Sequence, residues 1–151
     1  MRYTHIMLDR LTDEDITRIL TDTRVIAMVG ASPRADRPSN QVGHFLAQQG
    51  YKVIPVNPGQ AGKELFGQRV VASLSEIDEP VDMVDIFRRS EAVEPVVEEA
   101  LRELKNLKYV WMQIGVVNEK AAALAVAHGA EVAMDRCPKI EIPRLGIAPV
   151  S

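Results

Sequence analysis

Residues 25–58, VIAMVGASPRADRPSNQVGHFLAQQGYKVIPVNP, contain the pattern that decides the fold. Two short apolar runs rich in β-branched residues, 25–32 and 52–58, are typical of strands that are buried on both faces. Between these runs lie three apolar residues at helical spacing: Val42, Phe45 and Leu46. The stretch therefore predicts a strand, a crossover helix and a second, parallel strand.

The same alternation continues along the rest of the chain. Further strand-like runs lie at 81–87, 109–115 and 130–137, and helical patterns separate them at 93–104 and 121–128. Because parallel strands need crossover connections, the sequence predicts an α/β fold. We expect a single doubly wound, mostly parallel five-stranded Rossmann-like sheet with helices on both faces.

Helix starts and chain length complete the predicted organisation. Thr12 and Asp15 form a capping-box pattern at the start of an N-terminal helix over about 12–22, and Ser73 and Glu76 form a second such pattern. Because the chain has 151 residues, of which 46% are hydrophobic and 26% charged, we expect one domain over 1–151 with that helix packed on it.

Composition argues against several classes of partner. The net charge of -3 is spread along the chain without a basic block, which disfavours nucleic acid and anionic membranes. No stretch has the roughly 18 uninterrupted apolar residues of a membrane span. The single cysteine, Cys137, excludes an internal disulfide, and the N-terminal residues show no signal or transit peptide, so we expect a cytoplasmic protein.

In a doubly wound sheet, ligands bind beyond the carboxyl ends of the strands. The segments that leave the five predicted strands are 30–40, 57–63, 87–90, 113–117 and 135–141. The first begins with Gly30 and leads into a helix, whose N-terminal N–H groups favour a phosphate. Its polar side chains are those of Ser32, Arg34, Arg37, Ser39 and Asn40. The alternative is a surface loop in which Ser39 or Asn40 only caps the helix.

A phosphate loop at this point is not of the common dinucleotide type. It lacks the GxGxxG pattern, and the second predicted strand ends in Asn57 instead of an acidic residue that binds ribose. These departures disfavour NAD, whereas an NADP site that uses Arg or Lys stays open. The absence of GxxxxGK[ST] excludes a Walker loop.

Each later exit offers a candidate with an ordinary alternative. Lys63 lies in a Gly-rich turn, where it reaches a phosphate or is simply solvated. Phe87 and Arg88 bracket an aromatic base, or Phe87 closes the core while Arg88 faces water. Cys137 is a small buried hydrophobe, or a thiol with basic neighbours that meets the thiol of a ligand.

The chain offers little catalytic machinery. Its histidines, His5, His44 and His128, stand apart from the strand exits and are interpreted as core or surface residues. No spacing of His, Cys, Asp or Glu indicates a metal site, and no GxSxG elbow occurs. No general base can be named for Cys137.

Together, these segments resemble a known family, the small stand-alone CoA-binding proteins. The similarity lies, in family order over about 12–148, in VGASPRADRPSNQVGHFLAQQGYKVIPVNP, SLSEI, VDMVDIFRRSEAV, WMQIGVVNEKAAALA and MDRCPKIE. The single Rossmann-like domain of these proteins is similar to the N-terminal CoA-binding domain of the succinyl-CoA synthetase alpha subunit. The phosphorylated histidine and the nucleotide-grasping subunit of the synthetase lie outside the region that this chain covers.

The resemblance implies a set of ligand-binding residues. The residues of the first loop that would hold CoA phosphates are Gly30, Ala31, Ser32, Arg37, Ser39 and Asn40. The adenine would lie near Phe87 and Arg88, and Gln113 and Gly115 would lie along the pantetheine path. The synthetase has a phosphate-binding lysine after its second strand, and Lys63 stands near that point in a turn of different spacing. Asn57 and Cys137 complete the predicted set.

The sequence thus predicts a protein that binds CoA or an acyl-CoA at the carboxyl ends of the strands, without evident catalytic residues. Two enzymatic alternatives stay open: an NADP-linked oxidoreductase, and an enzyme that transforms CoA thioesters through Cys137. A third alternative is a redox-responsive carrier in which Cys137 forms a mixed disulfide with CoA.

Overall fold

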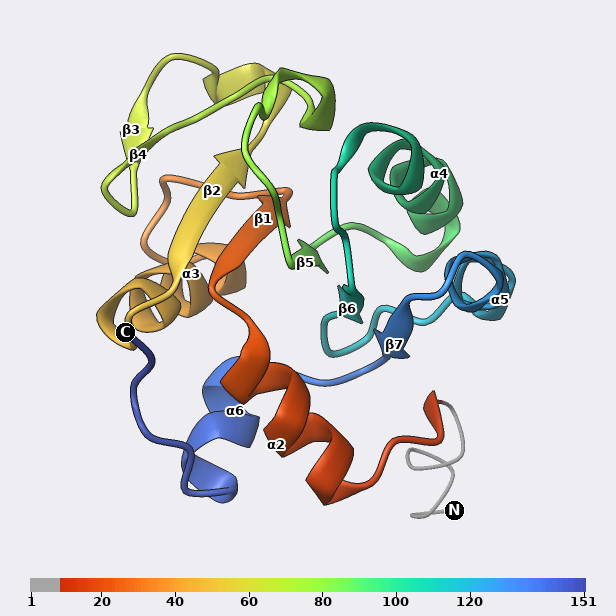
Figure 1. Ribbon diagram of the computed structural model, residues 1–151. Coiled ribbons are helices and arrows are strands. Elements are labelled where there is room, and N and C mark those ends of the chain that lie inside the picture. The colour runs from red at the N-terminus through yellow and green to blue at the C-terminus, as the bar shows by residue number, and fades with distance from the viewer. Residues whose placement is uncertain (1–8) are drawn as a thin grey trace.

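The centre of the fold is a parallel sheet of five strands in the order β2-β1-β5-β6-β7 (Figure 1). The structure is a computed structural model that describes residues 9–151, so His5 lies outside the described residues. The strands are β1 (Val25–Val29), β2 (Lys52–Val56), β5 (Met83–Ile86), β6 (Tyr109–Met112) and β7 (Glu131–Ala133). β1 pairs with β2 on one side and β5 on the other, so the strand order reverses beside β1. Ligands of doubly wound sheets bind at such a switch point.

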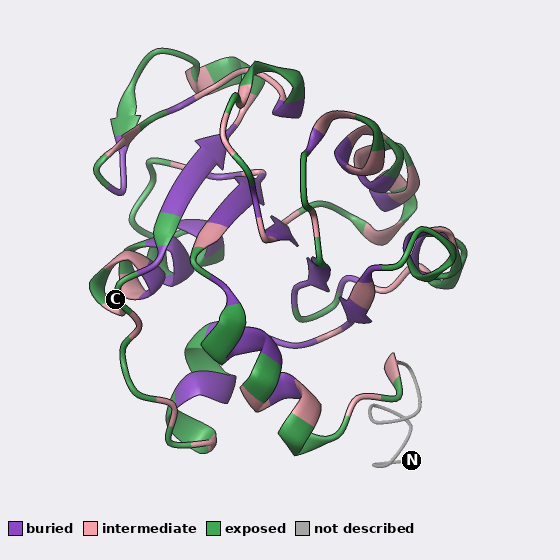
Figure 2. Cartoon of the chain, in the orientation of Figure 1, coloured by how far each residue is buried: buried purple, intermediate pink, exposed green. Residues whose placement is uncertain are grey.

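Helices cover both faces of the sheet, as the sequence predicts. α4 (Val93–Glu103) and α5 (Glu119–Ala127) pack on one face, whereas α2 (Asp13–Asp22), α3 (Pro38–Gln48) and α6 (Pro138–Arg144) pack on the other. Strand residues alternate between the two cores: Ala27 joins the core of α4 and α5, and its neighbours Ile26 and Met28 join that of α2, α3 and α6. The strands are therefore buried almost throughout (Figure 2), and the predicted fold class is confirmed.

One of the two predicted capping boxes forms. The Thr12 hydroxyl accepts the Asp15 backbone N–H at 3.1 Å, and the Asp15 carboxylate accepts the Thr12 N–H at 2.9 Å at the start of α2. The predicted cap at Ser73 is wrong, because that residue makes no side-chain cap and precedes only the short 3₁₀ turn η2 (Leu74–Glu76). Two further 3₁₀ turns are η1 (Pro58–Gln60) and η3 (Ser90–Ala92).

A small antiparallel hairpin extends the connection after β2. Its strands are β3 (Glu64–Leu65) and β4 (Gln68–Arg69), and the sequence pattern did not predict them. Phe66, at the tip, is buried against α3, where Gly43 leaves room for its ring because a Cβ at that position would collide with it. The hairpin and α3 thus share one core with the first two strands.

Helix α6 is the second element that the sequence pattern did not predict. The strand-like run 130–137 ends in the structure at Ala133, and α6 begins at Pro138 with Cys137 as its N-cap residue. Within residues 9–151, no helix has both the length and the apolar character that a membrane crossing requires.

Candidate functional site

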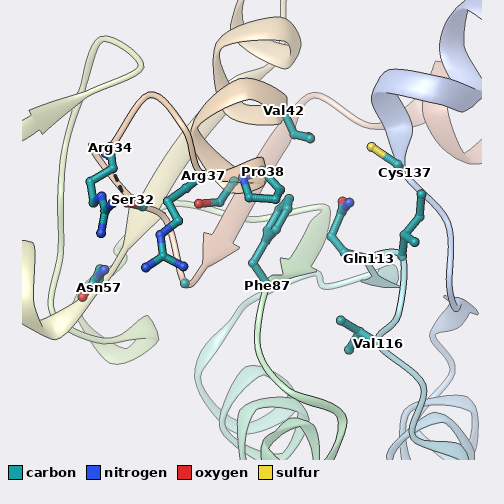
Figure 3. A pocket seen from close by; sticks show the side chains of 13 residues that line it. Ser32, Arg34, Arg37, Pro38, Val42, Asn57, Phe87, Gln113, Val116 and Cys137 are labelled. Atoms are coloured by element: carbon teal, nitrogen blue, oxygen red, sulfur yellow. Dashed lines mark hydrogen bonds between the residues drawn. The ribbon is translucent and has the colours of Figure 1, made fainter.

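A cavity of about 660 Å³ opens at the carboxyl ends of β1 and β5, next to the N-terminus of α3 (Figure 3). Most of the predicted binding residues line it: Gly30, Ser32, Arg37, Ser39, Asn57, Phe87, Gln113 and Cys137. The other lining residues are Arg34, Pro38, Val42, Ile114 and Val116. Residues from all five strand exits and from helix α3 therefore meet at the switch point of the sheet, although they are far apart in sequence.

One end of the cavity is cationic and offers N–H donors. Arg37 is the N-cap residue of α3 but its side chain does not cap the helix, and Pro38 at the first helical position has no N–H. Ser39, the next residue, is 4% exposed and lines the cavity. Arg34 pairs with Asp36 at 3.2 Å, whereas Arg37 forms no ion pair with any residue from 9 to 151. Helix dipole and guanidinium charge together favour an anion at this end.

Side-chain amides hold the backbone of the loop between β1 and α3. Asn40 donates to the Ser32 carbonyl at 3.0 Å, and Asn57 donates to the Ala31 carbonyl at 2.7 Å. Asn40 is buried and does not line the cavity, so its contribution is to brace the loop. Ala31 is fully buried in the core beneath the loop.

Gly30 has a geometric reason to be glycine. Its φ of +87° lies in the left-handed region, and a Cβ there would collide with the carbonyl oxygen of Phe87. The Phe87 N–H in turn donates to the Val29 carbonyl at 2.9 Å, which continues the pairing of β1 with β5. Glycine therefore lets the chain pass close to the backbone of Phe87 as it leaves β1.

The other end of the cavity is apolar. Val42 of α3, Phe87 after β5, and Ile114 and Val116 after β6 supply its hydrocarbon surface, and Cys137 closes it from the N-terminus of α6 (Figure 3). Ile114 is 57% exposed, so this end is open to solvent at its rim. A ligand that fits the whole cavity has an anionic part and a long, largely uncharged part.

Cys137 is 8% exposed, and the charges near it are already engaged. The guanidinium of Arg136 is bound by Asp9 at 2.6 Å and by Glu141 at 3.2 Å. Lys139 lies 6.0 Å above the ring of Phe45. Among residues 9–151, no three His, Cys, Asp or Glu side chains gather in a way that holds a metal ion.

A buried carboxyl lies directly behind the cavity wall. Asp85 is fully buried in β5, and burial raises its pKa well above the ordinary value of an aspartate. With the side-chain nitrogen of Gln113 facing it, that nitrogen donates to the two Asp85 oxygens at 2.9 and 3.2 Å. Gln113 thus connects a buried acid to the cavity surface, and the sequence pattern did not single out Asp85.

A second, smaller cavity of about 370 Å³ adjoins the first at Gly30 and Asn57, which line both. Arg88 lines this second cavity together with Ala72, Ser73 and Glu99. The structure therefore does not bring Phe87 and Arg88 together in one cavity.

Besides Ala31 and Asn40, two further predicted residues line neither cavity. Lys63 is exposed and donates to Gln60 at 2.7 Å. Gly115 lies between the lining residues Ile114 and Val116, and its N–H donates to Asp135 at 2.7 Å. His44 and His128 are also exposed and line neither cavity.

With this geometry described, the relatives of the chain decide its family. The family described as CoA binding domain matches residues 24–143. The chain belongs to this CoA-binding domain family. Its matched region runs from the residue before β1 into α6 and so includes both cavities. The predicted resemblance is thereby confirmed.

Individual relatives agree with this assignment. The chain is 42% identical over 126 residues to the uncharacterized protein YneT of Bacillus subtilis, which covers 83% of this chain and 90% of YneT. It is 37% identical to a hypothetical protein of Pyrococcus horikoshii, with a TM-score of 0.85 over 91% of this chain and 94% of that one. An acetyl-coenzyme A synthetase of Ca. Korarchaeum cryptofilum shares the fold alone, at 24% identity and a TM-score of 0.66, over 82% of this chain and 28% of the synthetase.

Proposed function

We propose that this protein binds coenzyme A or a short acyl-CoA across the switch point between β1 and β5. The observation that carries the proposal is the main cavity, which joins a cationic helix N-terminus to an apolar channel in a chain of the CoA-binding domain family. CoA has the matching order of parts, because its diphosphate lies between a nucleotide and a long, uncharged pantetheine arm. The two adjoining cavities accommodate these two halves on either side of Gly30.

In the proposed complex, the diphosphate lies at the N-terminus of α3 between Ser32, Ser39 and Arg37. The adenosine lies in the second cavity beside Arg88, whose charge faces the 3′-phosphate. The pantetheine arm follows the apolar channel past Phe87, and its thiol ends near Cys137. Asn40 and Asn57 act indirectly by holding the loop.

In this proposal, the protein binds its ligand without catalysing a reaction. A nucleophilic cysteine needs a base, and among residues 9–151 no carboxylate, imidazole or amine is hydrogen-bonded to Cys137. The nearest charged side chain in sequence, Arg136, is held by Asp9 and Glu141. The NADP alternative lacks a distinguishing observation in the structure, so NADPH serves as a control ligand.

Isothermal titration calorimetry tests the proposal with CoA, acetyl-CoA, NADPH, pantetheine and adenosine 3′,5′-bisphosphate. We expect Arg37→Ala to weaken CoA binding by about tenfold, the value of a charged hydrogen bond to phosphate, and to leave pantetheine binding unchanged. The matched control is Arg69→Ala, because Arg69 is an exposed arginine of β4 outside both cavities. Absence of heat with CoA and acetyl-CoA at near-millimolar concentration refutes the proposal, and an equal loss for CoA and pantetheine removes Arg37 from the phosphate site.

A further inference from the structure

The interior of β5 contains a carboxyl group in an otherwise apolar layer. Asp85 pairs in register with Met28 of β1 and Trp111 of β6, and its side chain is 0% exposed. Among residues 9–151 no arginine or lysine forms an ion pair with it. A buried carboxyl without a cation destabilises a fold relative to an apolar residue of similar size. Packing and stability therefore do not account for an acid at this position.

The single partner of Asp85 among the described residues is the side chain of Gln113. With the amide nitrogen turned toward the acid, it lies 2.9 Å from one carboxyl oxygen and 3.2 Å from the other. An ionised acid accepts from the amide nitrogen, whereas a neutral acid also has an O–H that donates to the amide oxygen, so the contact persists in either charge state. The other polar atom of the amide then points away from Asp85, and Gln113 is one of the residues that line the main cavity.

The backbone of Gln113 is fixed on both sides. Its N–H donates to the Ile86 carbonyl at 3.4 Å, and its carbonyl accepts the Val116 N–H at 2.8 Å. With only 5% of the residue exposed, the side chain has little freedom besides a rotation of the terminal amide. That rotation decides which polar atom of the amide the cavity wall presents, and the contact with Asp85 holds the amide in place with one polar atom facing outward.

We propose that Asp85 is a positioning residue, which holds the Gln113 amide so that its outer polar atom forms a hydrogen bond with the pantetheine arm of the ligand. This inference rests on the proposed function and identifies the residue that recognises the uncharged half of the ligand. The pantetheine arm carries two secondary amides, and each has an N–H and a C=O that the apolar channel otherwise leaves without a partner. Asp85 itself touches no ligand, because it lies behind Gln113 and is fully buried.

A double-mutant cycle tests the proposal in the full-length protein, with CoA and adenosine 3′,5′-bisphosphate as the ligands. We expect Asp85→Leu to weaken CoA binding about three- to tenfold, the effect of one misplaced hydrogen bond, without changing nucleotide binding. Asp85→Asn keeps an acceptor oxygen for Gln113, and we expect its CoA affinity within about twofold of the wild type. Because Asp85 acts through Gln113, we expect the Asp85→Leu/Gln113→Leu double variant to bind CoA as weakly as Gln113→Leu alone.

Thermal unfolding of the same variants separates positioning from a structural role. We expect Asp85→Leu to melt no lower than the wild type, because it replaces a buried acid that has no cationic partner with an apolar side chain. Asp85→Ala runs through the same cycle as a smaller substitution, should Leu be too large for the layer. Additive losses in the cycle, an equal loss for the nucleotide, or failure of Asp85→Asn to preserve affinity would each overturn the proposal. A wild type that binds the nucleotide but not CoA, or neither ligand, instead refutes the proposed function itself.

Discussion

Replacement of the buried Asp85 by asparagine is predicted to change the pH dependence of the free energy of unfolding in a definite direction. Asp85 is fully buried and its pKa is raised well above the ordinary value because burial disfavours the charged form. In the unfolded chain the same group titrates near about 3.9. Above that pH the folded protein binds a proton that the unfolded chain has released, so its free energy of unfolding falls as pH rises.

The magnitude follows from this linkage. Between the unfolded and the folded pKa of Asp85, each pH unit lowers the free energy of unfolding by about 1.4 kcal/mol, because one proton is taken up on folding. Asp85→Asn removes the titration, so we expect its stability relative to the wild type to grow by about 1.4 kcal/mol per pH unit from about pH 4 up to the folded pKa of Asp85. For a chain of this size, that corresponds to roughly 3 to 5 °C in melting temperature per unit.

Thermal and urea unfolding from pH 4.5 to 7.5, followed by circular dichroism, measure the difference. Comparison with the wild type cancels the contributions of other carboxylates, such as Asp13 and Asp15, whose lowered pKa values give slopes of the opposite sign below about pH 5. Asp78→Asn, at an exposed aspartate, is the matched control and is expected to parallel the wild type. A constant difference between Asp85→Asn and wild type over this range would falsify the assignment of a raised pKa.

Three further substitutions or reagents probe the loop, the channel and the first helix. Gly30→Ala is expected to lower the free energy of unfolding by about 1–3 kcal/mol more than Gly67→Ala in urea titrations, since both glycines have positive φ but only Gly30 faces the Phe87 carbonyl. Saturating CoA is expected to slow alkylation of Cys137, the single cysteine and hence the single site in mass spectrometry; an unchanged rate places the ligand elsewhere. Thr12→Ala removes the cap of α2 and is expected to cost about 1 kcal/mol in thermal unfolding, whereas Thr12→Ser is expected to retain it.

The sheet and most of the main cavity follow from sequence because they depend on coarse features. Buried parallel strands appear as short apolar runs, and crossover helices appear as periodic patterns between them. Once the runs at Val25–Val29 and Met83–Ile86 are recognised, topology brings their carboxyl ends to one edge of the sheet. The residues that follow those ends therefore meet at the switch point whatever the details of the loops.

The elements that the sequence patterns did not predict are either very short or have an atypical sequence pattern. β3 and β4 have two residues each, which is too few for a period to be visible, and their hairpin is held by Phe66 packing on α3. α6 contains Pro143 in its interior and follows directly on an apolar strand run, so the pattern suggested a longer strand and a loop. These two elements complete the core of the face that carries Cys137.

Side-chain direction is the second feature that the sequence patterns did not predict. Phe87 and Arg88 are neighbours at one strand exit, but they line different cavities, which a list of exit residues does not reveal. The loop residue Asn40 likewise carries a polar group of the right type, but the structure turns it inward to the Ser32 carbonyl. Residue type at an exit thus predicts which segments form the site better than which side chains reach the ligand.

Asp85 shows what a closer reading of the strand offers. The run VDMVDIF contains two aspartates, and the apolar pattern treats both as interruptions of a buried strand. Asp82 precedes β5 and accepts the N–H groups of Arg24 and Val25 at 3.0 Å each, which is an ordinary role at the sheet edge. Asp85 lies inside the strand, where water cannot reach it, and its one described partner lines the main cavity. A polar residue inside a predicted buried strand, next to a predicted binding edge, is therefore a candidate functional residue that strand periodicity alone discards.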